Sequence, residues 1–468
     1  MSCAITAASI QSRTRCAATH IMSKRTHKKR LPQPVSGVTI DSLSHDGRGV
    51  AHLDGKAVFI DGALPGEVVD FEYLVSRRKF DEGRVTAVQQ ASPDRVEPKC
   101  PHFGLCGGCS LQHMDPGAQV RAKQQVLLDN LGHIGKVEPE AVLPPLIGPV
   151  WGYRTKGRLG VKDVIKKGRV LVGFREKRSS YVADLSRCEV LHPSVGERFQ
   201  ELSGLIERLQ AKARIPQIEV AVAGETTALV FRNLDPLTPA DTEKLKQFAV
   251  DCQLHIYLQP GGPDTVQPLW PEQQSLSYHL PAQDIEIQFR PTDFTQINTA
   301  VNEQMIARVL ALLALDKTDR VLDLFCGLGN FTLPMARQAG AVVGVEGESG
   351  LVNRARENAV LNGIENASFH TANLAEDHVG SAWVGAGYNK VLLDPPRSGA
   401  AEVLDILGNI HPARIVYVSC HPGSLARDAG RLVNEKGYRL LAAGVMDMFP
   451  HTAHVESIAL FEPTLASV

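Results

Sequence analysis

The chain has 468 residues, a length that predicts about three domains. Hydrophobic residues make up 43% and charged residues 22%, as in globular proteins, and no stretch approaches the roughly 18 uninterrupted apolar residues of a membrane span. We therefore exclude a membrane protein and expect a cytoplasmic chain with no membrane partner.

The first 34 residues are basic, with seven Lys or Arg and no acidic residue, and they lack the apolar segment of a secretory signal. The cluster at residues 24–30 is compatible with an organelle transit peptide or with an arm that touches RNA. We expect a disordered basic arm over residues 1–34. Since the net charge of the chain is −1, the remainder carries −8, and any nucleic-acid surface must be a local patch.

Residues 36–91 alternate short β-rich runs with glycine-containing turns. The runs are GVTIDSL, GVAHL, KAVFIDG, EVVDFEYLV and GRVTAV. Strands this short need closure to bury one face and to protect their edges. We predict a small OB-like β-barrel over residues 35–95, which is either a generic β-domain or an RNA-binding one.

Residues 96–291 mix helix and strand patterns irregularly and are predicted to form a central α+β domain. Helical patterns lie near residues 118–131, 195–213 and 240–250, and strand patterns lie at 218–222, 228–231 and 285–289.

From residue 292 the order of elements becomes regular. Helices alternate with the apolar strands RVLDLF, AVVGVE, ASFH, KVLLD and RIVYVS, and two further β runs close the chain. This alternation predicts a mainly parallel sheet covered on both faces, in a doubly wound, Rossmann-like domain over residues 292–468. Ligands of such sheets bind at the carboxyl ends of the strands.

The segment DLFCGLGNFTLP, residues 323–334, has the pattern of a ligand-binding turn. Gly327 and Gly329 allow the backbone to approach a ligand closely. Glu346 ends the next strand, where a carboxylate can accept hydrogen bonds from ribose hydroxyls. Because the segment lacks a complete G-x-G-x-x-G, the pattern favours S-adenosylmethionine over a dinucleotide.

The segment VLLDPPRSG, residues 391–399, ends the fourth strand with Asp394 and two prolines. The prolines remove two backbone donors, so the turn offers carbonyls and a carboxylate to a ligand. Methyltransferases that act on exocyclic amines use a similar Asp-Pro-Pro followed by an aromatic residue. Arg397 stands there instead, which weakens the amine interpretation.

Cys420, in IVYVSCHPGSLARD, follows the fifth strand, and Pro422 suits the first turn of a helix. A helix N-terminus lowers a thiol pKa, so we expect a nucleophile rather than an inert buried cysteine. Sulfur added at C6 of uracil makes C5 nucleophilic, and a base must then remove the C5 proton. Glu456, in HTAHVESIALF, is a candidate base or simply an exposed strand residue.

The segment KCPHFGLCGGCSLQH supplies Cys100, Cys106 and Cys109, and Cys188 is a candidate fourth ligand. Their spacing leaves zinc and a [4Fe-4S] cluster equally open.

Between Arg154 and Arg178 the chain carries ten Lys or Arg and two acidic residues, with Trp151, Tyr153, Phe174 and Tyr181 interleaved or adjacent. Basic residues neutralise phosphates and aromatic rings stack on splayed bases, so this run is a candidate RNA surface or a solvated basic hairpin.

Five ordered segments, namely DFTQIN (293–298), DLFCGLGNFTLP, DPPRSG, SCHP and HTAHVES, resemble the S-adenosylmethionine-dependent RNA uracil-C5 methyltransferases. With the barrel and the cysteines, the chain after about residue 30 resembles the branch that acts on bacterial 23S rRNA, in which the barrel is a TRAM domain. The resemblance implies a class I methyltransferase domain, Cys420 as nucleophile, Glu456 as general base and a [4Fe-4S] cluster on the four cysteines. It assigns S-adenosylmethionine to Gln296, Phe325, Asn330, Glu346, Asn373 and Asp394.

One departure from that branch is His421, where Asn is more usual. The expected partner is 23S rRNA, with the target uridine flipped out of a loop, and no obligate protein partner is expected. Two alternatives stay open: an RNA cytosine-C5 methyltransferase, which would use the same thiol chemistry, and a cluster-bearing RNA-binding factor without catalysis.

Overall fold

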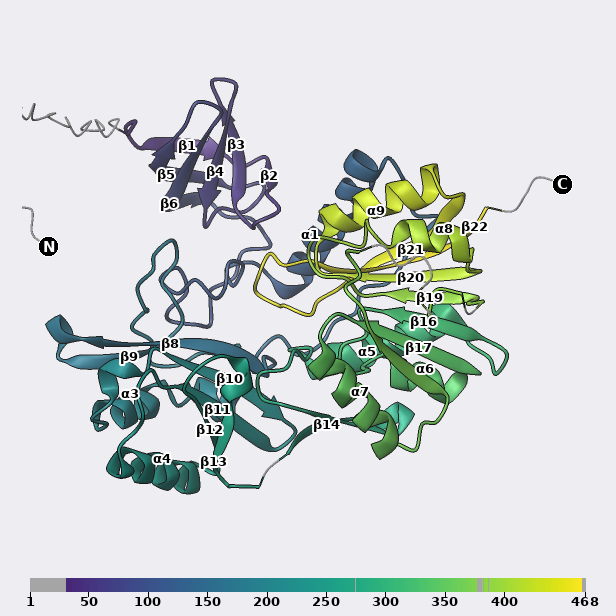
Figure 1. The fold of residues 1–468 in the computed structure, drawn as a ribbon. Helices are drawn as coiled ribbons and strands as arrows, with labels where there is room; N and C mark the ends of the chain where they lie inside the picture. Colours follow the sequence, from purple (N-terminus) through teal and green to yellow (C-terminus); the bar gives the residue numbers. More distant parts are fainter. Residues whose placement is uncertain (1–30, 274, 377–380, 382, 386, 465–468) are drawn as a thin grey trace, which may run out of the picture.

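A computed structural model describes residues 31–464 apart from residues 274, 377–380, 382 and 386. The basic arm expected over residues 1–34 therefore lies almost wholly outside the described residues. Figure 1 shows a small β-domain in purple, an α+β domain in blue and teal, and an α/β domain in green and yellow. None of the described helices has the length and apolar character needed to cross a membrane.

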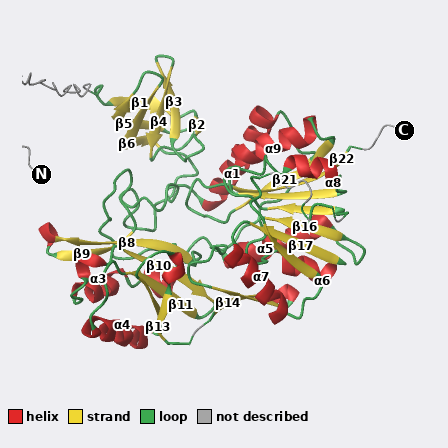
Figure 2. Ribbon diagram, in the orientation of Figure 1, coloured by secondary structure: helices red, strands yellow, loops and turns green. Residues whose placement is uncertain are grey.

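The N-terminal domain is a six-stranded sheet wrapped around a small apolar core (Figure 2). Its strands are β1 (Val35–Thr39), β2 (Ser42–Leu43), β3 (Gly49–Leu53), β4 (Lys56–Asp61), β5 (Val68–Ser76) and β6 (Phe80–Gln90), in the order β1-β5-β6-β4-β3-β2. Gly83 is required in β6, because a Cβ there would lie 2.4 Å from the ring of Phe71. The OB-like architecture expected over residues 35–95 is thus built from short strands on one core.

The central domain is a second six-stranded sheet with helices on one face. Its strands follow the order β13-β12-β11-β10-β8-β9. They are β8 (Lys156–Val164), β9 (Arg169–Gly173), β10 (Gln217–Ala223), β11 (Thr226–Arg232), β12 (His255–Gln259) and β13 (Gln267–Trp270), and the helices are α2 (Pro193–Gly196), α3 (Phe199–Glu207) and α4 (Pro239–Cys252).

The single helix expected over residues 195–213 is divided and ends early. The buried Asp241 carboxylate of α4 accepts the backbone N–H groups of Gln210 at 2.9 Å and Ala211 at 3.0 Å. These donors are thereby turned away from the helix ladder, and the chain passes into a short 3-10 turn at Lys212–Arg214. A tertiary contact overrides the local helical pattern here.

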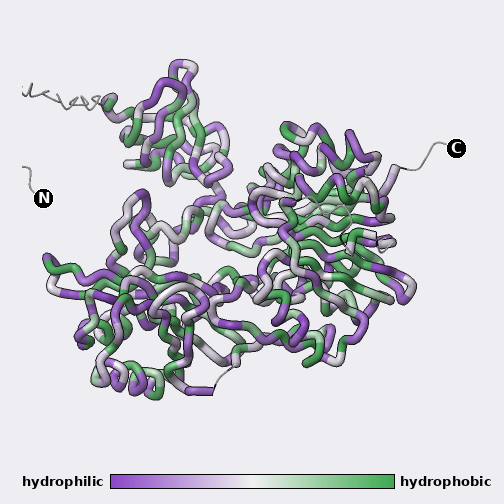
Figure 3. The backbone as a smooth tube through the Cα atoms, in the orientation of Figure 1, coloured by the Kyte–Doolittle hydropathy of each residue, from purple (hydrophilic) through white to green (hydrophobic). Residues whose placement is uncertain are grey.

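The C-terminal domain is built on an eight-stranded sheet in the order β18-β17-β16-β19-β20-β22-β21-β7. Its strands are β16 (Arg320–Leu324), β17 (Ala341–Glu346), β18 (Ala367–Thr371), β19 (Lys390–Leu393), β20 (Arg414–Ser419), β21 (Tyr438–Met446) and β22 (Glu456–Pro463). Its helices are α5 (Thr299–Leu313), α6 (Thr332–Gln338), α7 (Ser349–Leu361), α8 (Leu404–Ile410) and α9 (Pro422–Asn434). The apolar strands lie in the middle layer of this domain (Figure 3).

Strands β16 to β20 run parallel, as the alternation of helices and strands predicts, whereas β22 is antiparallel to both β20 and β21. The hairpin of β14 (Leu276–Leu280) and β15 (Ile285–Phe289) joins this domain to the central one. Asn358 of α7 and Asn362, directly after that helix, each accept a backbone N–H of β15 and so hold the hairpin against the domain.

Part of the range 96–291 packs away from the central sheet. Helix α1 (Pro116–Asn130), the π-helical turn Leu131–Gly135 and β7 (Ala141–Val142) lie with the C-terminal domain, where β7 pairs with β21. Leu127 and Leu131 are fully buried in the apolar cluster of that domain. Two separate segments of the chain therefore build this domain, and the second segment forms the strands that position the site.

Candidate active site and cysteine cavity

The turn after β16 brings backbone groups to the carboxyl edge of the sheet. Phe325 and Cys326 both donate their N–H groups to the carbonyl of Val345, at 2.8 and 3.1 Å. Phe325 is left-handed with φ 69°, and Gly327 and Gly329 follow with φ 54° and 91°. The predicted ligand-binding turn is thus folded back over the end of β17, beside Glu346.

The Glu346 carboxylate is held by backbone donors. It accepts the N–H groups of Gly347 at 2.6 Å, Glu348 at 3.1 Å and Gly327 at 3.2 Å. These bonds fix an acidic group at the end of β17, the position that suits ribose hydroxyls.

Asn330 is bound to other side chains and does not project freely. Its Oδ1 accepts from the Tyr278 hydroxyl at 2.9 Å and from Asn302 Nδ2 at 3.1 Å, and its Nδ2 donates to Asn302 Oδ1 at 2.9 Å. Tyr278 and Asn302 are partners of Asn330 that the sequence did not indicate, since a Tyr in an α+β domain and an Asn in a helix carry no signal of their own.

Two carboxyl groups, the buried Asp323 and the half-buried Asp394, lie at the same edge. Burial raises the pKa of Asp323 to about 7, while its hydrogen bond from Thr332 opposes the shift. Burial also raises the pKa of Asp394 well above its usual value, and the nearby charges of Glu456 and Asp323 add to that shift. Of the other expected cofactor residues, Gln296 lies half-buried in the loop before α5 and Asn373 lies exposed just after β18.

Strand register brings Cys420 and Glu456 together. Ser419, the last residue of β20, pairs with Ser457 of the antiparallel β22. Cys420 and Glu456 are the next residues outward on these two strands, so they face one another at the open edge of the sheet. The negative charges of Glu456 and Asp394 both raise the pKa of the Cys420 thiol. The structure therefore unites three predicted site residues from separate segments.

The expectation of a lowered thiol pKa is wrong. Burial raises the pKa of Cys420 to about 11, the charges of Glu456 and Asp394 add to the shift, and the Arg397 guanidinium opposes it. Cys420 does precede α9, but His421 is the N-cap, and its ring nitrogen accepts the Ser424 N–H at 3.2 Å. The helix end is therefore occupied by the imidazole. His421 thus fills a capping role that Asn also performs well.

A chain of three side chains reaches Glu456 from the Asp-Pro-Pro-Arg turn. Arg397 NH2 lies 3.4 Å from His454 Nδ1, and His454 Nε2 lies 3.2 Å from Glu456 Oε1. The side chains of His454 and Glu456 are 20% and 12% exposed. Neither His454 nor a role for Arg397 was found from sequence.

The loop between β21 and β22, residues 447–455, reaches out of the C-terminal domain (Figure 1). The carbonyl of His451 accepts the N–H groups of Ser110 at 2.9 Å and Leu111 at 3.0 Å, directly after the last clustered cysteine. His451, left-handed with φ 65°, stacks on Trp151 with ring centroids 3.9 Å apart. The loop that leads into Glu456 is therefore bound to the cysteine segment.

Cys100, Cys106, Cys109 and Cys188 line one cavity of about 270 Å³. Burial raises the pKa of Cys106 to about 11 and the pKa of Cys109 to about 12. The charges of the neighbouring cysteine thiolates contribute to both increases. Among the described residues, no group of three or more His, Cys, Asp and Glu side chains is arranged to hold a metal ion. The four predicted ligands are thus brought to one place without converging on one point.

The basic run between Arg154 and Arg178 is partly engaged within the protein. Lys156 is half-buried and donates to the carbonyls of Pro291 and Asp293, and burial lowers its pKa to about 8. Arg169 and Lys167 both pair with Asp184. Of the four aromatic residues considered, Tyr181 is 73% exposed, whereas Tyr153, Phe174 and Trp151 are buried or half-buried.

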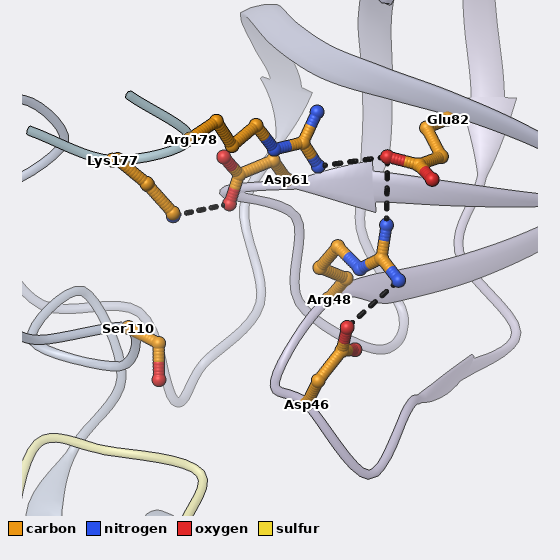
Figure 4. Close-up of a pocket in the computed structure, with 7 residues that line it drawn as sticks. All are labelled: Asp46, Arg48, Asp61, Glu82, Ser110, Lys177 and Arg178. Carbon is orange, nitrogen blue, oxygen red and sulfur yellow. Dashed lines mark hydrogen bonds and ion pairs between the residues drawn. The ribbon is translucent and has the colours of Figure 1, made fainter. Parts of the chain in front are cut away.

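The end of this basic run, at Lys177 and Arg178, also contacts the N-terminal domain (Figure 4). Lys177 pairs with Asp61 at 2.6 Å, and Arg178 and Arg48 both pair with Glu82, at 3.3 and 3.4 Å. The domain further contacts the β21–β22 loop, because a Cβ on Gly47 would lie 3.1 Å from Ala453. The three domains thus meet around the approach to Glu456.

Comparisons with known proteins agree with this architecture. Residues 217–463 match the family model "tRNA (Uracil-5-)-methyltransferase", and residues 35–86 match "TRAM domain". The chain is 57% identical over 438 residues to the 23S rRNA (uracil(1939)-C(5))-methyltransferase RlmD of Xanthomonas campestris, covering 93% of this chain and 99% of the relative. The protein of the same name from Methylococcus capsulatus is 54% identical over 442 residues, covering 94% and 100%.

Among solved structures, the Pyrococcus abyssi tRNA (uracil-54, C5)-methyltransferase in complex with S-adenosyl-L-homocysteine matches with a TM-score of 0.70 and 25% identity, covering 91% of this chain and 99% of that one. The expected TRAM and Rossmann-like methyltransferase architecture is confirmed. The chain belongs to the TRAM-containing RNA uracil-C5 methyltransferase family.

Proposed function

We propose that the chain transfers a methyl group from S-adenosylmethionine to C5 of one uridine in 23S rRNA, the position that the relatives' names give as 1939. The observation that carries the proposal is the strand register that sets Cys420 opposite Glu456, with Asp394 beside them. A nucleophile and a base at the carboxyl edge of a methyltransferase sheet suit addition, methylation and elimination on a pyrimidine.

S-adenosylmethionine supplies an electrophilic methyl group on a sulfonium ion. The residues that would hold it are Gln296, Phe325, Asn330, Glu346, Asn373 and Asp394. Glu346 supports this assignment because three backbone donors fix its carboxylate where a ribose would lie. The left-handed turn from Phe325 to Gly329 supports it because backbone can approach a ligand there.

In the first half of the reaction the Cys420 sulfur would bond to C6 of uracil, and the electrons of the C5–C6 double bond would pass to C5. C5 would then take the methyl group, and the electron pair of the broken S–CH3 bond would stay on sulfur, which leaves as S-adenosylhomocysteine. The thiol must lose its proton first. Burial and two neighbouring carboxylates oppose that loss in the free protein, where the thiol pKa is about 11. A cationic S-adenosylmethionine, if held by these residues, would favour the thiolate.

In the second half Glu456 removes the C5 proton. The electrons of the C5–H bond form the C5–C6 double bond, the C6–S bond breaks, and its electron pair returns to the Cys420 sulfur. The half-buried position of Glu456 at the start of β22, next to the Ser419–Ser457 pair that precedes Cys420, supports this role.

We also propose that Cys100, Cys106, Cys109 and Cys188 hold a [4Fe-4S] cluster. Each thiolate of such a cluster binds a different iron atom, so the ligands surround a volume instead of converging on one ion. Four cysteines around a cavity of about 270 Å³ fit that requirement. Iron and zinc analysis of anaerobically purified protein tests this, with about four irons per chain expected and one zinc as the contrary result.

Trapping with 5-fluorouridine RNA tests the methyl-transfer proposal. Fluorine cannot leave C5 as a proton does, so a covalent complex of protein, RNA and methyl group should accumulate with the native protein and should be absent with Cys420→Ala. Mass spectrometry of the product nucleoside distinguishes 5-methyluridine from 5-methylcytidine. Absence of the complex with cofactor present, or methylated cytidine as the product, would overturn the proposal.

A further inference from the structure

We propose that His454 is a positioning residue for the base: its Nε2–H holds Oε1 of Glu456, and Arg397 fixes the tautomer that makes this possible. This inference rests on the proposed function of Glu456 and adds two residues to it. It derives from a juxtaposition of three side chains on two segments: Arg397 lies after β19, and His454 and Glu456 lie where the β21–β22 loop runs into β22.

The tautomer follows from the chemistry of the partners. A guanidinium has only N–H donors and no acceptor. His454 Nδ1, which lies 3.4 Å from Arg397 NH2, must therefore present its lone pair to Arg397. A neutral imidazole then carries its proton on Nε2, which lies 3.2 Å from Glu456 Oε1 and donates to it. Arg397 thus determines what His454 offers to the carboxylate.

The backbone and the neighbouring ring hold this geometry. His454 lies two residues before Glu456, the first residue of β22, and its Nε2 is 3.2 Å from Glu456 Oε1, while Val455 between them is buried in the core. The His454 N–H donates to Thr452 Oγ1 at 3.2 Å. The Phe449 ring meets the imidazole edge to face, with centroids 4.4 Å apart. The imidazole therefore has a defined plane before substrate binds.

The electrostatic surroundings explain why a base here needs such a donor. Asp394, Cys420 and Lys123 all interact with Glu456, and Asp394 and Cys420 become less acidic beside its charge. Around His454 itself the charged or titratable groups are Arg397, Glu456 and His421. A donor bond to Oε1 fixes the orientation of the carboxylate and leaves Oε2 to receive the C5 proton.

The inference predicts that loss of His454 slows one step, the removal of the C5 proton. When His454 is replaced by Asn, the amide cannot reach Glu456 from the position of Nε2, so proton removal and release of sulfur should slow while the first half of the reaction continues. The methylated covalent RNA complex should then accumulate on natural uridine RNA. When His454 is replaced by Gln, the longer amide places an N–H near the former Nε2, and turnover should stay within several-fold of native.

The experiment compares full-length native protein, His454→Asn, His454→Gln and Glu456→Gln, with His411→Asn as the matched control. His411 is an exposed residue in the left-handed position after α8, a conformation that Asn accepts readily. Steady-state methylation is measured with labelled cofactor, and the covalent fraction is measured on denaturing gels. His454→Asn should lose turnover about tenfold or more, accumulate the complex, and move the acidic limb of the pH–rate profile to higher pH.

The outcomes separate this inference from the proposed function. If Glu456→Gln accumulates the complex and His454→Asn does not, Glu456 remains the base and the positioning role is refuted. If Glu456→Gln itself fails to accumulate the complex, the proposed role of Glu456 has failed. Equal loss with Asn and Gln at position 454, without accumulation, would show a merely structural role and also overturn the inference.

Discussion

Lys123 of α1 and Asp447, just after β21, form an ion pair at 2.7 Å in which both side chains are almost fully buried, 3% and 4% exposed. Lys123 also donates to the carbonyl of Phe449 at 3.0 Å. This pair links α1, in the first of the two segments that build the methyltransferase domain, with the loop that carries His454 and leads to Glu456. The N-terminal half of the protein therefore takes part in shaping the site.

Removing one partner of this pair should be costly. Lys123→Met leaves the Asp447 carboxylate buried without its counter-ion, and we expect the free energy of unfolding to fall by about 3–5 kcal/mol. Urea unfolding followed by circular dichroism measures the loss. The double variant Lys123→Met/Asp447→Leu should regain most of it, because no charge is then buried alone. A double variant as unstable as the single one would contradict this account.

The charges around Cys420 should control how fast an alkylating reagent modifies its thiol, and this rate should change independently of the rate of methylation. With a pKa of about 11, the thiolate fraction at pH 7 is on the order of one in ten thousand. Glu456→Gln removes a charge that raises this pKa, so iodoacetamide should modify Cys420 faster at pH 8, although catalytic turnover is lost. Arg397→Gln should make modification slower. Peptide mass spectrometry reads Cys420 separately from the other cysteines, and unchanged rates in both variants would refute the electrostatic explanation.

The buried Asp323 should make stability depend on pH. Its pKa of about 7 in the folded protein exceeds the usual value of 3.8, so between these values the folded state binds more protons than the unfolded state. The contribution of Asp323 to stability is therefore present at low pH and is lost as pH rises toward 7, by an amount on the order of 4 kcal/mol at most. Asp323→Asn should flatten this part of the stability curve between pH 4 and 8, measured by denaturant unfolding at several pH values. An unchanged slope would contradict the assignment.

The ion pairs of Figure 4 should govern docking of the TRAM domain more than its folding. Asp61→Asn with Glu82→Gln removes the partners of Lys177 and Arg178, and we expect less than about 1 kcal/mol per pair in unfolding free energy. We expect a larger radius of gyration in small-angle scattering and faster proteolysis between residues 91 and 99. Glu72→Gln, which breaks an exposed pair with Arg84 on the same domain, is the control and should change neither measurement.

The sequence alone predicted the number and class of domains and the segments that carry the chemistry. Apolar strands alternating with helices identify a parallel sheet because burial on both faces requires an uninterrupted apolar run. The glycine turn at Gly327 and Gly329 and the acidic residue at Glu346 are local signals, since they depend on backbone freedom and strand length. Cys420 and Glu456 were identified from short motifs and a resemblance, which name residues without placing them.

Only the tertiary structure decided how those residues act on one another. The thiol pKa was mispredicted because a helix end is a local feature, whereas burial and the charges of Glu456 and Asp394 come from other strands. The central domain predicted over residues 96–291 included α1 and β7, which pack with the third domain. The strand with which β7 pairs, β21, lies about 300 residues later in the chain. The contacts of Arg397 with His454, and of His451 with the cysteine segment, are likewise long-range. Distances between segments, and the low dielectric that surrounds them, exist only after the chain has packed.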